Sequence, residues 1–177
     1  LNFNDLTDIS ALSGLTNLTY LNVSDNDVAD LTPLSGLTKV QKMDLSYNEI
    51  VDLTPLADLK QLTYLDIMSN DIVNVTPLVR LTQLEYLDLG YNDVTNLKPL
   101  AYLTWLTELD LGKNGVTDLS PLAALTRLKE LNLNYNADLT DLSPLAGLTG
   151  LEKIWLWDCD KIVDYSPVEH VPTIYLR

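Results

Sequence analysis

Apolar and polar residues alternate in a short pattern that recurs at a constant spacing, about every 22 residues, along the chain. In one copy, Leu18, Leu21 and Val23 are separated by polar positions, and Asn26 and Val28 follow them. Alternation with a period of two is typical of a short strand with one buried face. The chain is therefore predicted to fold as stacked units, each of which contributes one strand to a parallel sheet.

The recurrence extends over nearly the whole chain. It gives about seven full units, each roughly 22 to 23 residues long, with a partial unit at each end, and so predicts seven stacked strands. One extra residue enters near residues 137–138, and residues 171–174 begin a last, unfinished unit. On a prior of about 150 residues per domain, we expect residues 1–177 to form a single repeat domain.

The second half of nearly every unit contains a proline that follows Thr, Ser or, once, Lys. Proline fixes φ and suits the first position of a helical turn, and the preceding Thr or Ser is expected to cap that turn. The segment is too short for a full helix, so a 3₁₀ turn is predicted. Thin return segments favour a curved stack with the strands on the inside. The prolines are Pro33, Pro55, Pro77, Pro99, Pro121, Pro144 and Pro167.

An asparagine follows each strand, where the chain turns inward. Its amide can both donate and accept hydrogen bonds, so we predict that it satisfies backbone groups in neighbouring turns. In the last full unit a cysteine takes this place; we expect a buried thiol, with a reactive thiol as the alternative. The predicted ladder is Asn26, Asn48, Asn70, Asn92, Asn114, Asn136 and Cys159.

The motif Leu-x-x-Leu-x-Leu-x-x-Asn resembles the leucine-rich repeat. The 22-residue length and the second half of the unit, NEIVDLTPLADL in residues 48–59, resemble the internalin family of bacterial surface proteins in particular. The resemblance implies an α/β solenoid: a right-handed superhelix with a parallel β-sheet on its concave face and 3₁₀ or short helical turns on its convex face. It also implies a non-enzymatic binding module that is a bacterial surface or secreted protein, contributes to virulence and engages a host receptor.

The polar strand positions line the open face of the predicted sheet. Exposed Tyr and Trp side chains are the usual anchors of protein interfaces, although flat rings can also simply cover a sheet or a cap edge. We predict one aromatic cluster near the middle of the sheet and another near its C-terminal end. The middle set is Tyr47, Tyr64, Tyr86 and Tyr91, the C-terminal set is Tyr135, Trp155 and Trp157, and Tyr20 completes the predicted partner-binding residues.

Four aspartates occupy equivalent positions in successive strands, roughly 5 Å apart. Like charges at such a spacing repel, so we predict raised pKa values for the inner pair, Asp66 and Asp88. These acids are either a habit of the repeat, with sideways hydrogen bonds, or an acidic strip that attracts a basic partner or a hard cation such as Ca²⁺. The strip is Asp44, Asp66, Asp88 and Asp110.

Composition excludes several classes of function. Eleven Lys and Arg against 25 Asp and Glu give a net charge of -14, which argues against nucleic-acid binding and against docking on anionic lipid. No apolar run approaches the roughly 18 residues of a membrane span. One cysteine and one histidine exclude an intrachain disulfide and multi-histidine zinc sites, and we expect no metal and no cofactor.

The remaining motifs are weak. Residues 24–27 resemble the start of a calcium loop, but the glycine and closing glutamate of such a loop are missing. His170 is expected to be a solvated histidine on a return segment. Trp105 occupies a turn position where other units carry polar residues, so it could mark a contact on the side edge of the stack.

Three alternatives to the surface receptor-binding module stay open. They are a cytoplasmic leucine-rich scaffold that regulates a phosphatase or similar enzyme, a targeting arm of a larger protein, and a calcium-binding spacer. The chain begins at Leu1 without a charged or apolar leader, so we expect a mature or trimmed segment. A signal peptide or wall anchor in the full gene would separate these alternatives.

Overall fold

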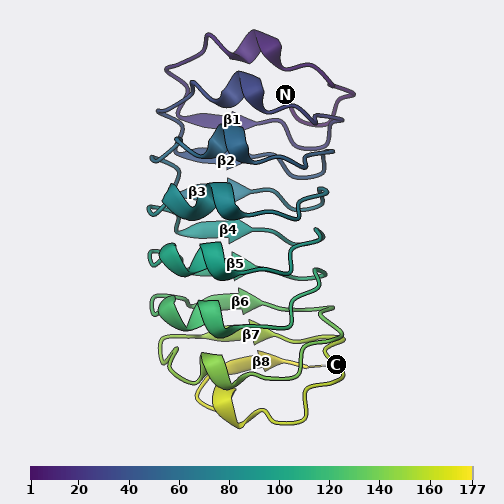
Figure 1. The fold of residues 1–177 in the computed structure, drawn as a ribbon, viewed down its shortest axis with the longest axis vertical. Helices are drawn as coiled ribbons and strands as arrows, with labels where there is room; N and C mark the ends of the chain where they lie inside the picture. The colour runs from purple at the N-terminus through teal and green to yellow at the C-terminus, as the bar shows by residue number, and fades with distance from the viewer. Residues whose placement is uncertain (177) are drawn as a thin grey trace.

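The computed structural model describes residues 1–176 as one stack of coils with eight parallel strands in a single sheet (Figure 1). Arg177, the last residue of the predicted domain, lies outside the described residues. The strands follow chain order along the sheet: β1 (Tyr20–Asn22), β2 (Lys42–Asp44), β3 (Tyr64–Asp66), β4 (Tyr86–Asp88), β5 (Glu108–Asp110), β6 (Glu130–Asn132), β7 (Lys153–Trp155) and β8 (Thr173–Tyr175).

The register of the sheet follows the repeat. Tyr64 lies opposite Tyr86, the equivalent position of the next unit, and the extra residue near 137–138 makes the step from β6 to β7 one residue longer. The last step is shorter, because Lys153 pairs with Thr173. The prediction of seven strands was therefore too low: the unfinished unit supplies β8, the last strand of the described sheet.

The return segments contain short 3₁₀ helices, as predicted, and proline occupies the first or second position in η2–η8. Their bounds are η1 (Ser10–Leu12), η2 (Thr32–Leu34), η3 (Thr54–Leu56), η4 (Thr76–Arg80), η5 (Lys98–Tyr102), η6 (Ser120–Ala124), η7 (Ser143–Leu145) and η8 (Ser166–Val168). The fold is the predicted solenoid, with the sheet on its concave face and the 3₁₀ turns on its convex face.

The predicted Thr or Ser cap is wrong. Thr32 is already the first residue of its 3₁₀ turn, and the preceding Leu31 makes no side-chain capping bond. The backbone N–H of Thr32 instead donates to Asp30 Oδ1 at 2.8 Å, which forms an Asx turn. The same bond recurs in the other coils, for example from Thr76 to Asn74, so the acid or amide two residues before the helix sets the turn.

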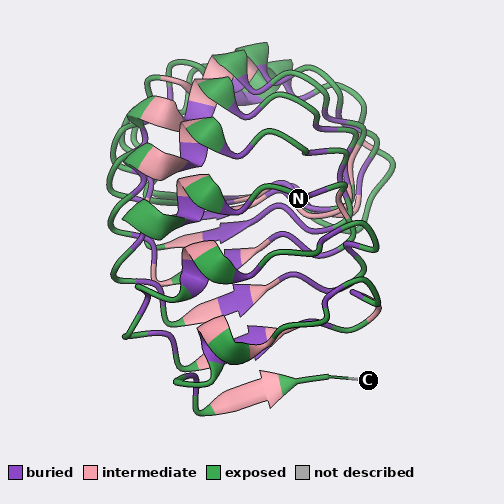
Figure 2. Cartoon of the chain, turned by 60° about the horizontal axis from the view of Figure 1, so that its bottom comes forward, coloured by how far each residue is buried: buried purple, intermediate pink, exposed green. Residues whose placement is uncertain are grey.

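The core lies between the strands and the return segments and continues from one end of the stack to the other (Figure 2). Leu65 and Leu87 point inward from the strands and are fully buried, as are Leu56 and Leu78 from the 3₁₀ turns. The intervening strand residues face the open side of the sheet. Packing therefore fixes the inward columns and leaves the outward columns available for recognition.

Each ladder asparagine joins two coils. Asn70 accepts a hydrogen bond from the backbone N–H of Ile50, at 2.9 Å, through Oδ1. Its Nδ2 donates to the carbonyl oxygens of Leu45 in the preceding coil and Ile67 in its own coil, both at 3.1 Å. Equivalent bonds recur from Asn48 to Asn136. The ladder therefore connects each turn to its own strand and to the coil before it.

Cys159 fills the ladder position with a buried thiol. Its Sγ lies 3.1 Å from the carbonyl oxygen of Leu133, where an asparagine amide would donate. A thiol is a weaker acceptor than the amide oxygen of an asparagine. The backbone N–H of Leu139, which would donate to that oxygen, donates instead to the carbonyl oxygen of Asn136 at 3.0 Å. The extra residue near 137–138 makes this bond possible. Burial raises the pKa of the Cys159 thiol, which disfavours the thiolate and hence a reactive role.

Candidate functional site

Outward side chains form rows that cross the strands on the concave face. The first strand position gives one row, which runs from Tyr20 through Tyr64 and Tyr86 to Lys153, and the third position gives the row of the acidic strip. Because neighbouring strands lie about 4.8 Å apart, residues of one row are in direct reach of each other. The concave face is therefore the place where side chains from distant parts of the sequence meet.

Tyr64 and Tyr86 stack face to face. Their ring centroids lie 4.2 Å apart, with an angle of 7° between the ring planes. Both rings are half-buried, and burial followed by the nearby aspartates raises the pKa of both phenols. The pair is neutral at physiological pH and forms a rigid aromatic surface at the middle of the sheet.

The structure does not bring the predicted middle set together as one cluster. Tyr47 and Tyr91 lie beyond the strand ends, at the opposite edge of the face from Tyr64 and Tyr86, and one coil, with Ser69 at the equivalent position, lies between them. Lys113 lies over the ring of Tyr91, with Nζ 4.8 Å from its centroid. Tyr20 is exposed on β1 beside Lys42. The four rings were grouped because their units lie near the middle of the stack, although they occupy two different columns of the repeat.

A second stacked pair closes the C-terminal side of the face. Trp155 on β7 stacks on Tyr175 on β8, with centroids 5.0 Å apart and planes 7° apart. Tyr175 is absent from the predicted site, because a full repeat step from Trp155 leads to residue 177, whereas the last coil is two residues shorter. Tyr135 and Trp157, of the same predicted set, line one hollow together.

The acidic strip forms a continuous row with amides at both ends. Asn22 donates to Asp44 Oδ2 at 2.8 Å, and Asn132 donates to Asp110 Oδ2 at 2.6 Å. Each aspartate also accepts the backbone N–H two residues further on, such as Gly90 N to Asp88 Oδ1 at 2.8 Å. The inner acids therefore face each other without an amide between them.

Burial dominates the electrostatics of the strip. Asp88 is only 9% exposed, and desolvation, followed by the charge of Asp110, raises its pKa to about 7. Desolvation raises the pKa of Asp66 to about 6, and it also raises the pKa of Asp110. The predicted direction for the inner pair is confirmed, but its main cause is burial, with like-charge repulsion second.

Two glycines make room for these carboxylates. A Cβ atom at Gly90 would lie 3.0 Å from Asp110 Oδ1 and 3.1 Å from Asp88 Oδ1. Gly112 approaches Asp110 Oδ1 in the same way, at 3.1 Å. Beside the glycines lies a hollow of about 270 Å³, and its walls include Tyr91, Tyr135 and Trp157.

A neighbouring hollow of about 170 Å³ lies over β4–β7. It is lined by Tyr86, Glu108, Leu109, Asp110, Glu130, Asn132 and Trp155. Glu108 and Glu130 are not among the predicted site residues, although the register that aligns the tyrosines also places these two acids side by side. Aromatic rings at the ends and acidic groups between them define the chemistry of this hollow.

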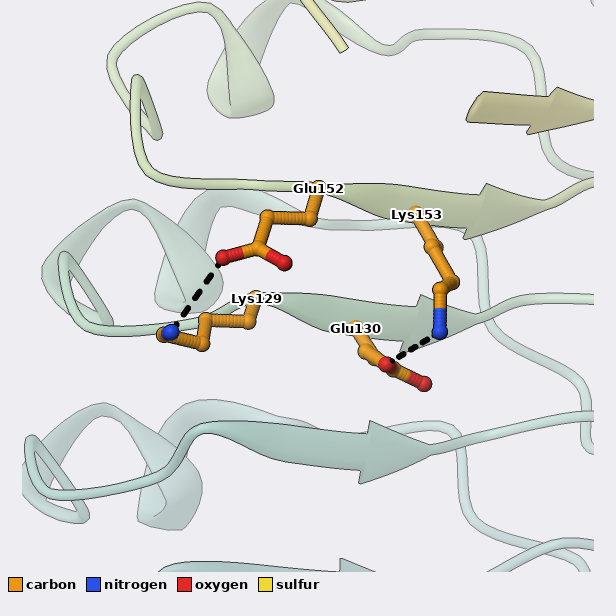
Figure 3. Close-up of polar contacts among 4 residues, drawn as sticks. All are labelled: Lys129, Glu130, Glu152 and Lys153. Atoms are coloured by element: carbon orange, nitrogen blue, oxygen red, sulfur yellow. Dashed lines mark hydrogen bonds and ion pairs between the residues drawn. The ribbon is translucent and has the colours of Figure 1, made fainter. Parts of the chain in front are cut away.

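Cross-strand ion pairs order one side of this hollow. Lys153 Nζ lies 2.6 Å from Glu130 Oε1, and Lys129 Nζ lies 3.2 Å from Glu152 Oε1, so the two pairs join β6 to β7 (Figure 3). Exposed ion pairs of this kind contribute little to stability. Within the site, the pair with Lys153 holds the Glu130 carboxylate in place.

Within residues 1–176, no group of three or more His, Cys, Asp or Glu side chains is arranged to hold a metal ion. In the same part of the chain, no helix is both long and apolar enough to cross a bilayer. His170 lies on the convex side after η8, where Nε2 is 3.0 Å from the carbonyl oxygen of Leu148. Trp105 is half-exposed on the side edge, where Arg127 covers its ring at 4.1 Å.

The residue before each ladder position adopts a left-handed backbone. Tyr47, for example, has φ 53°, a conformation that costs an ordinary L-residue roughly 1 kcal/mol and that Asn tolerates better. The non-glycine residues with positive φ are Phe3, Asp25, Tyr47, Ser69, Tyr91, Lys113, Tyr135 and Asp158. Since aspartate, serine and lysine serve equally well there, the turn does not require the tyrosine rings.

We therefore expect Tyr47→Asn to be more stable than Tyr47→Ala by about 0.5–1 kcal/mol and within about 0.5 kcal/mol of the unmodified protein. Both variants lose the ring, which is 49% exposed, but asparagine tolerates the positive φ. Chemical denaturation of the three proteins measures the difference. If both variants lost stability on the scale of a core truncation, about 2 kcal/mol or more, the ring would be part of the core packing.

Comparisons with known proteins agree with this architecture. The family model for leucine-rich repeats (2 copies) matches residues 1–36, 82–124 and 126–170. The crystal structure of internalin C2 from Listeria monocytogenes is 36% identical, with a TM-score of 0.85, and the match covers 99% of this chain and 78% of that one. No curated protein sequence matches this chain significantly.

Two further structures cover a smaller share of the matched protein. Internalin F from Listeria monocytogenes is 31% identical, with a TM-score of 0.74, and the match covers 96% of this chain and 57% of that one. A leucine-rich repeat protein from Leptospira interrogans is 22% identical, with a TM-score of 0.75 and coverage of 97% and 53%, and shares the fold. This chain therefore spans little more than half of each of these two proteins.

Proposed function

Since the chain belongs to the leucine-rich repeat family, and within it to the internalin-like proteins, we propose that it is a non-enzymatic module that binds a protein partner on its concave face. Proteins of this fold are typically interaction modules. Beyond this general role, we propose that the partner binds the concave face, that the aromatic rings there contact it, and that the chain has no catalytic role.

The observation that carries the proposal is the stacked pair of Tyr64 and Tyr86 on the open side of the sheet. The core beneath the pair is already closed by Leu65 and Leu87, which are fully buried. Rigid, half-exposed aromatic rings lose little conformational entropy on binding and are enriched among the residues that dominate interface energies. The acidic strip beside the pair adds charge that selects the partner.

The residues that most often carry catalysis are poorly placed for it. His170, the chain's single histidine, lies on the convex side, away from the carboxylates of the sheet. The Cys159 thiol is buried and hydrogen-bonded to Leu133. A nucleophile and a base within hydrogen-bonding reach are needed for covalent catalysis, and these two groups do not form such a pair.

We extend the proposal to location and partner. The similarity to two internalins of Listeria monocytogenes supports a bacterial surface or secreted protein. In that setting the partner is a protein exposed on a host cell, and the cytoplasmic scaffold is the alternative that the gene's flanking sequences would distinguish. The acidic composition, with a net charge of -14, suits a partner with a basic surface.

The double variant Tyr64→Ala/Tyr86→Ala is expected to capture a host membrane protein at least about tenfold more weakly than the unmodified chain, because two central aromatic anchors are lost. The measurement is a pull-down from detergent extracts of candidate host cells. The captured protein is then identified and titrated by surface plasmon resonance against both forms.

Tyr102→Ala is the matched control, because Tyr102 is an exposed tyrosine at the end of η5 on the convex side. Its capture should equal that of the unmodified chain. Thermal melts of all three proteins verify that they are folded. Equal capture by the double variant and the unmodified chain would exclude the concave face as the binding surface.

A further inference from the structure

Building on the proposed function, we propose that the hollow over β4–β7, between Tyr86 and Trp155, receives a cationic side chain, lysine or arginine, of the bound protein. The proposal deepens the concave-face assignment by naming the chemistry of the contact. It rests on the two stacked aromatic pairs, the acids between them and the size of the hollow.

The two aromatic pairs bracket the hollow. Tyr86 is stacked on Tyr64 from β3, and Trp155 is stacked on Tyr175 from β8, so each ring is covered on its outer side. Both rings line the hollow that lies between them over β5 and β6. The ring face of Tyr or Trp attracts a cation through its negative quadrupole, and Arg is the most frequent partner.

Three acidic residues line the hollow between the two rings. Glu108 and Glu130 are register neighbours on β5 and β6, and Asp110 lies at the other end of β5. Carboxylates in a fixed array accept the parallel N–H groups of a guanidinium or the ammonium group of lysine. A volume of about 170 Å³ admits the end of one long side chain but not a folded element.

The chain's own cations show how this face accepts a positive charge. Lys153 Nζ binds Glu130 Oε1 at 2.6 Å (Figure 3). On the same face, Lys113 lies over the Tyr91 ring. Glu108, directly beside Glu130, forms no side-chain hydrogen bond and no ion pair with any residue of the described chain. The carboxylate of Glu108 is therefore available to a cation from a partner.

The acidic strip, of which Asp110 lines the hollow, favours the same ligand. Asn22 and Asn132 occupy the same row as the acidic strip, so an asparagine side chain fits this position. Four coils nevertheless carry aspartate there, and the fold itself does not require that charge. Asp88 and Asp110 lose hydration there, and burial raises the pKa of both. A partner's cation would offset the repulsion within the row, so charge complementarity selects a basic residue over a neutral one.

The test uses small peptides as probes. An acetyl-Gly-Arg-Gly-amide peptide, titrated into ¹⁵N-labelled protein at pH 8, should shift the indole N–H of Trp155 and the backbone amides of β4–β7 in a saturable manner. The same peptide with citrulline in place of arginine has nearly the same shape but no charge. It should bind at least about fivefold more weakly, because the charge-assisted contacts are lost.

Glu108→Gln removes one charge from the hollow and should weaken binding of the arginine peptide by about three- to tenfold. Glu169→Gln is the matched control, because it removes the same charge from the exposed convex side after η8. Equal weakening by both variants would show attraction by net charge alone and overturn the proposal. Equal binding of the citrulline peptide would also overturn it, since the hollow would then recognise neutral groups.

The outcome is separable from that of the proposed function. If capture of the host protein depends on Tyr64 and Tyr86 while the arginine peptide leaves Trp155 unshifted, the concave-face assignment stands and the cation site falls. If the peptide binds as expected while capture is insensitive to these tyrosines, the hollow binds a cation but the host protein does not bind the concave face, and both proposals about that protein are overturned.

Discussion

Replacing Asn70 by leucine is expected to lower the free energy of unfolding by about 3–5 kcal/mol, although the two side chains have similar shapes. Asn70 is 8% exposed and forms four hydrogen bonds with backbone groups of two coils. No cavity forms in the variant, so the loss comes from hydrogen bonding and desolvation.

The groups that Asn70 leaves behind differ in how well they are satisfied. The carbonyl of Leu45 keeps a bond from Asn48, and that of Ile67 keeps a bond from Asn92. The buried N–H of Ile50 bonds only to Asn70 Oδ1 in the described chain. One orphaned donor costs about 1–3 kcal/mol, and the lost bonds to the carbonyls add to it.

Thermal and denaturant unfolding, followed by circular dichroism, measure the effect, and a fall in Tm of about 6–20 °C is expected for a chain of this size. Asn74→Leu in the same coil is the control, because Asn74 is exposed and its single backbone bond can be replaced by water. We expect that variant to lose about 1 kcal/mol or less. Unchanged melting of Asn70→Leu would contradict the role of the ladder.

Much of this architecture follows from the repeat in the sequence. A constant period makes Tyr64 and Tyr86 neighbours before any coordinate is known, and the structure places their rings 4.2 Å apart. The period likewise predicts the ladder and the row of aspartates, because each is one column of a stack. Relations between equivalent positions are therefore readable from sequence when the step between coils is constant.

The features that the sequence did not reveal depend on departures from that constant step or on local backbone geometry. The shortened last coil pairs Trp155 with Tyr175. The left-handed residue before each asparagine moves Tyr47 and Tyr91 to the far edge of the face. The burial of Asp88 depends on its surroundings in three dimensions, including the close approach of Gly90. None of these is encoded by the column pattern alone.

Asp88→Asn is expected to raise the free energy of unfolding at pH 8 by about 2–4 kcal/mol and to change it little at pH 4. Burial and the charge of Asp110 raise the pKa of Asp88 from 3.8 to about 7, so ionising this carboxyl at pH 8 opposes folding. An amide carries no charge, can still accept the Gly90 N–H and can donate to a neighbouring aspartate, as Asn132 does.

The sign follows from proton binding. Between pH 4 and 7 the folded state binds the Asp88 proton more tightly than the unfolded chain does, so stability declines as pH rises through this range. Asp66, with a pKa raised to about 6, acts in the same direction. The opposite trend comes from Asp30 and Asp52, whose pKa values are lowered by bonds to Thr32 and Thr54, and it acts below about pH 4. The unmodified chain should therefore be more stable at pH 5 than at pH 8.

Denaturant unfolding of both proteins at pH 4, 6 and 8 gives the difference directly, and the gap between them should open as pH rises. Asp71→Asn is the control, since Asp71 is an exposed carboxylate in the adjacent turn and its change should stay within about 0.5 kcal/mol at every pH. A loss of stability in Asp88→Asn at pH 8 would mean that the carboxylate is held by favourable contacts. The gain expected here means instead that ionising the buried Asp88 carboxyl costs the fold stability, as its raised pKa requires.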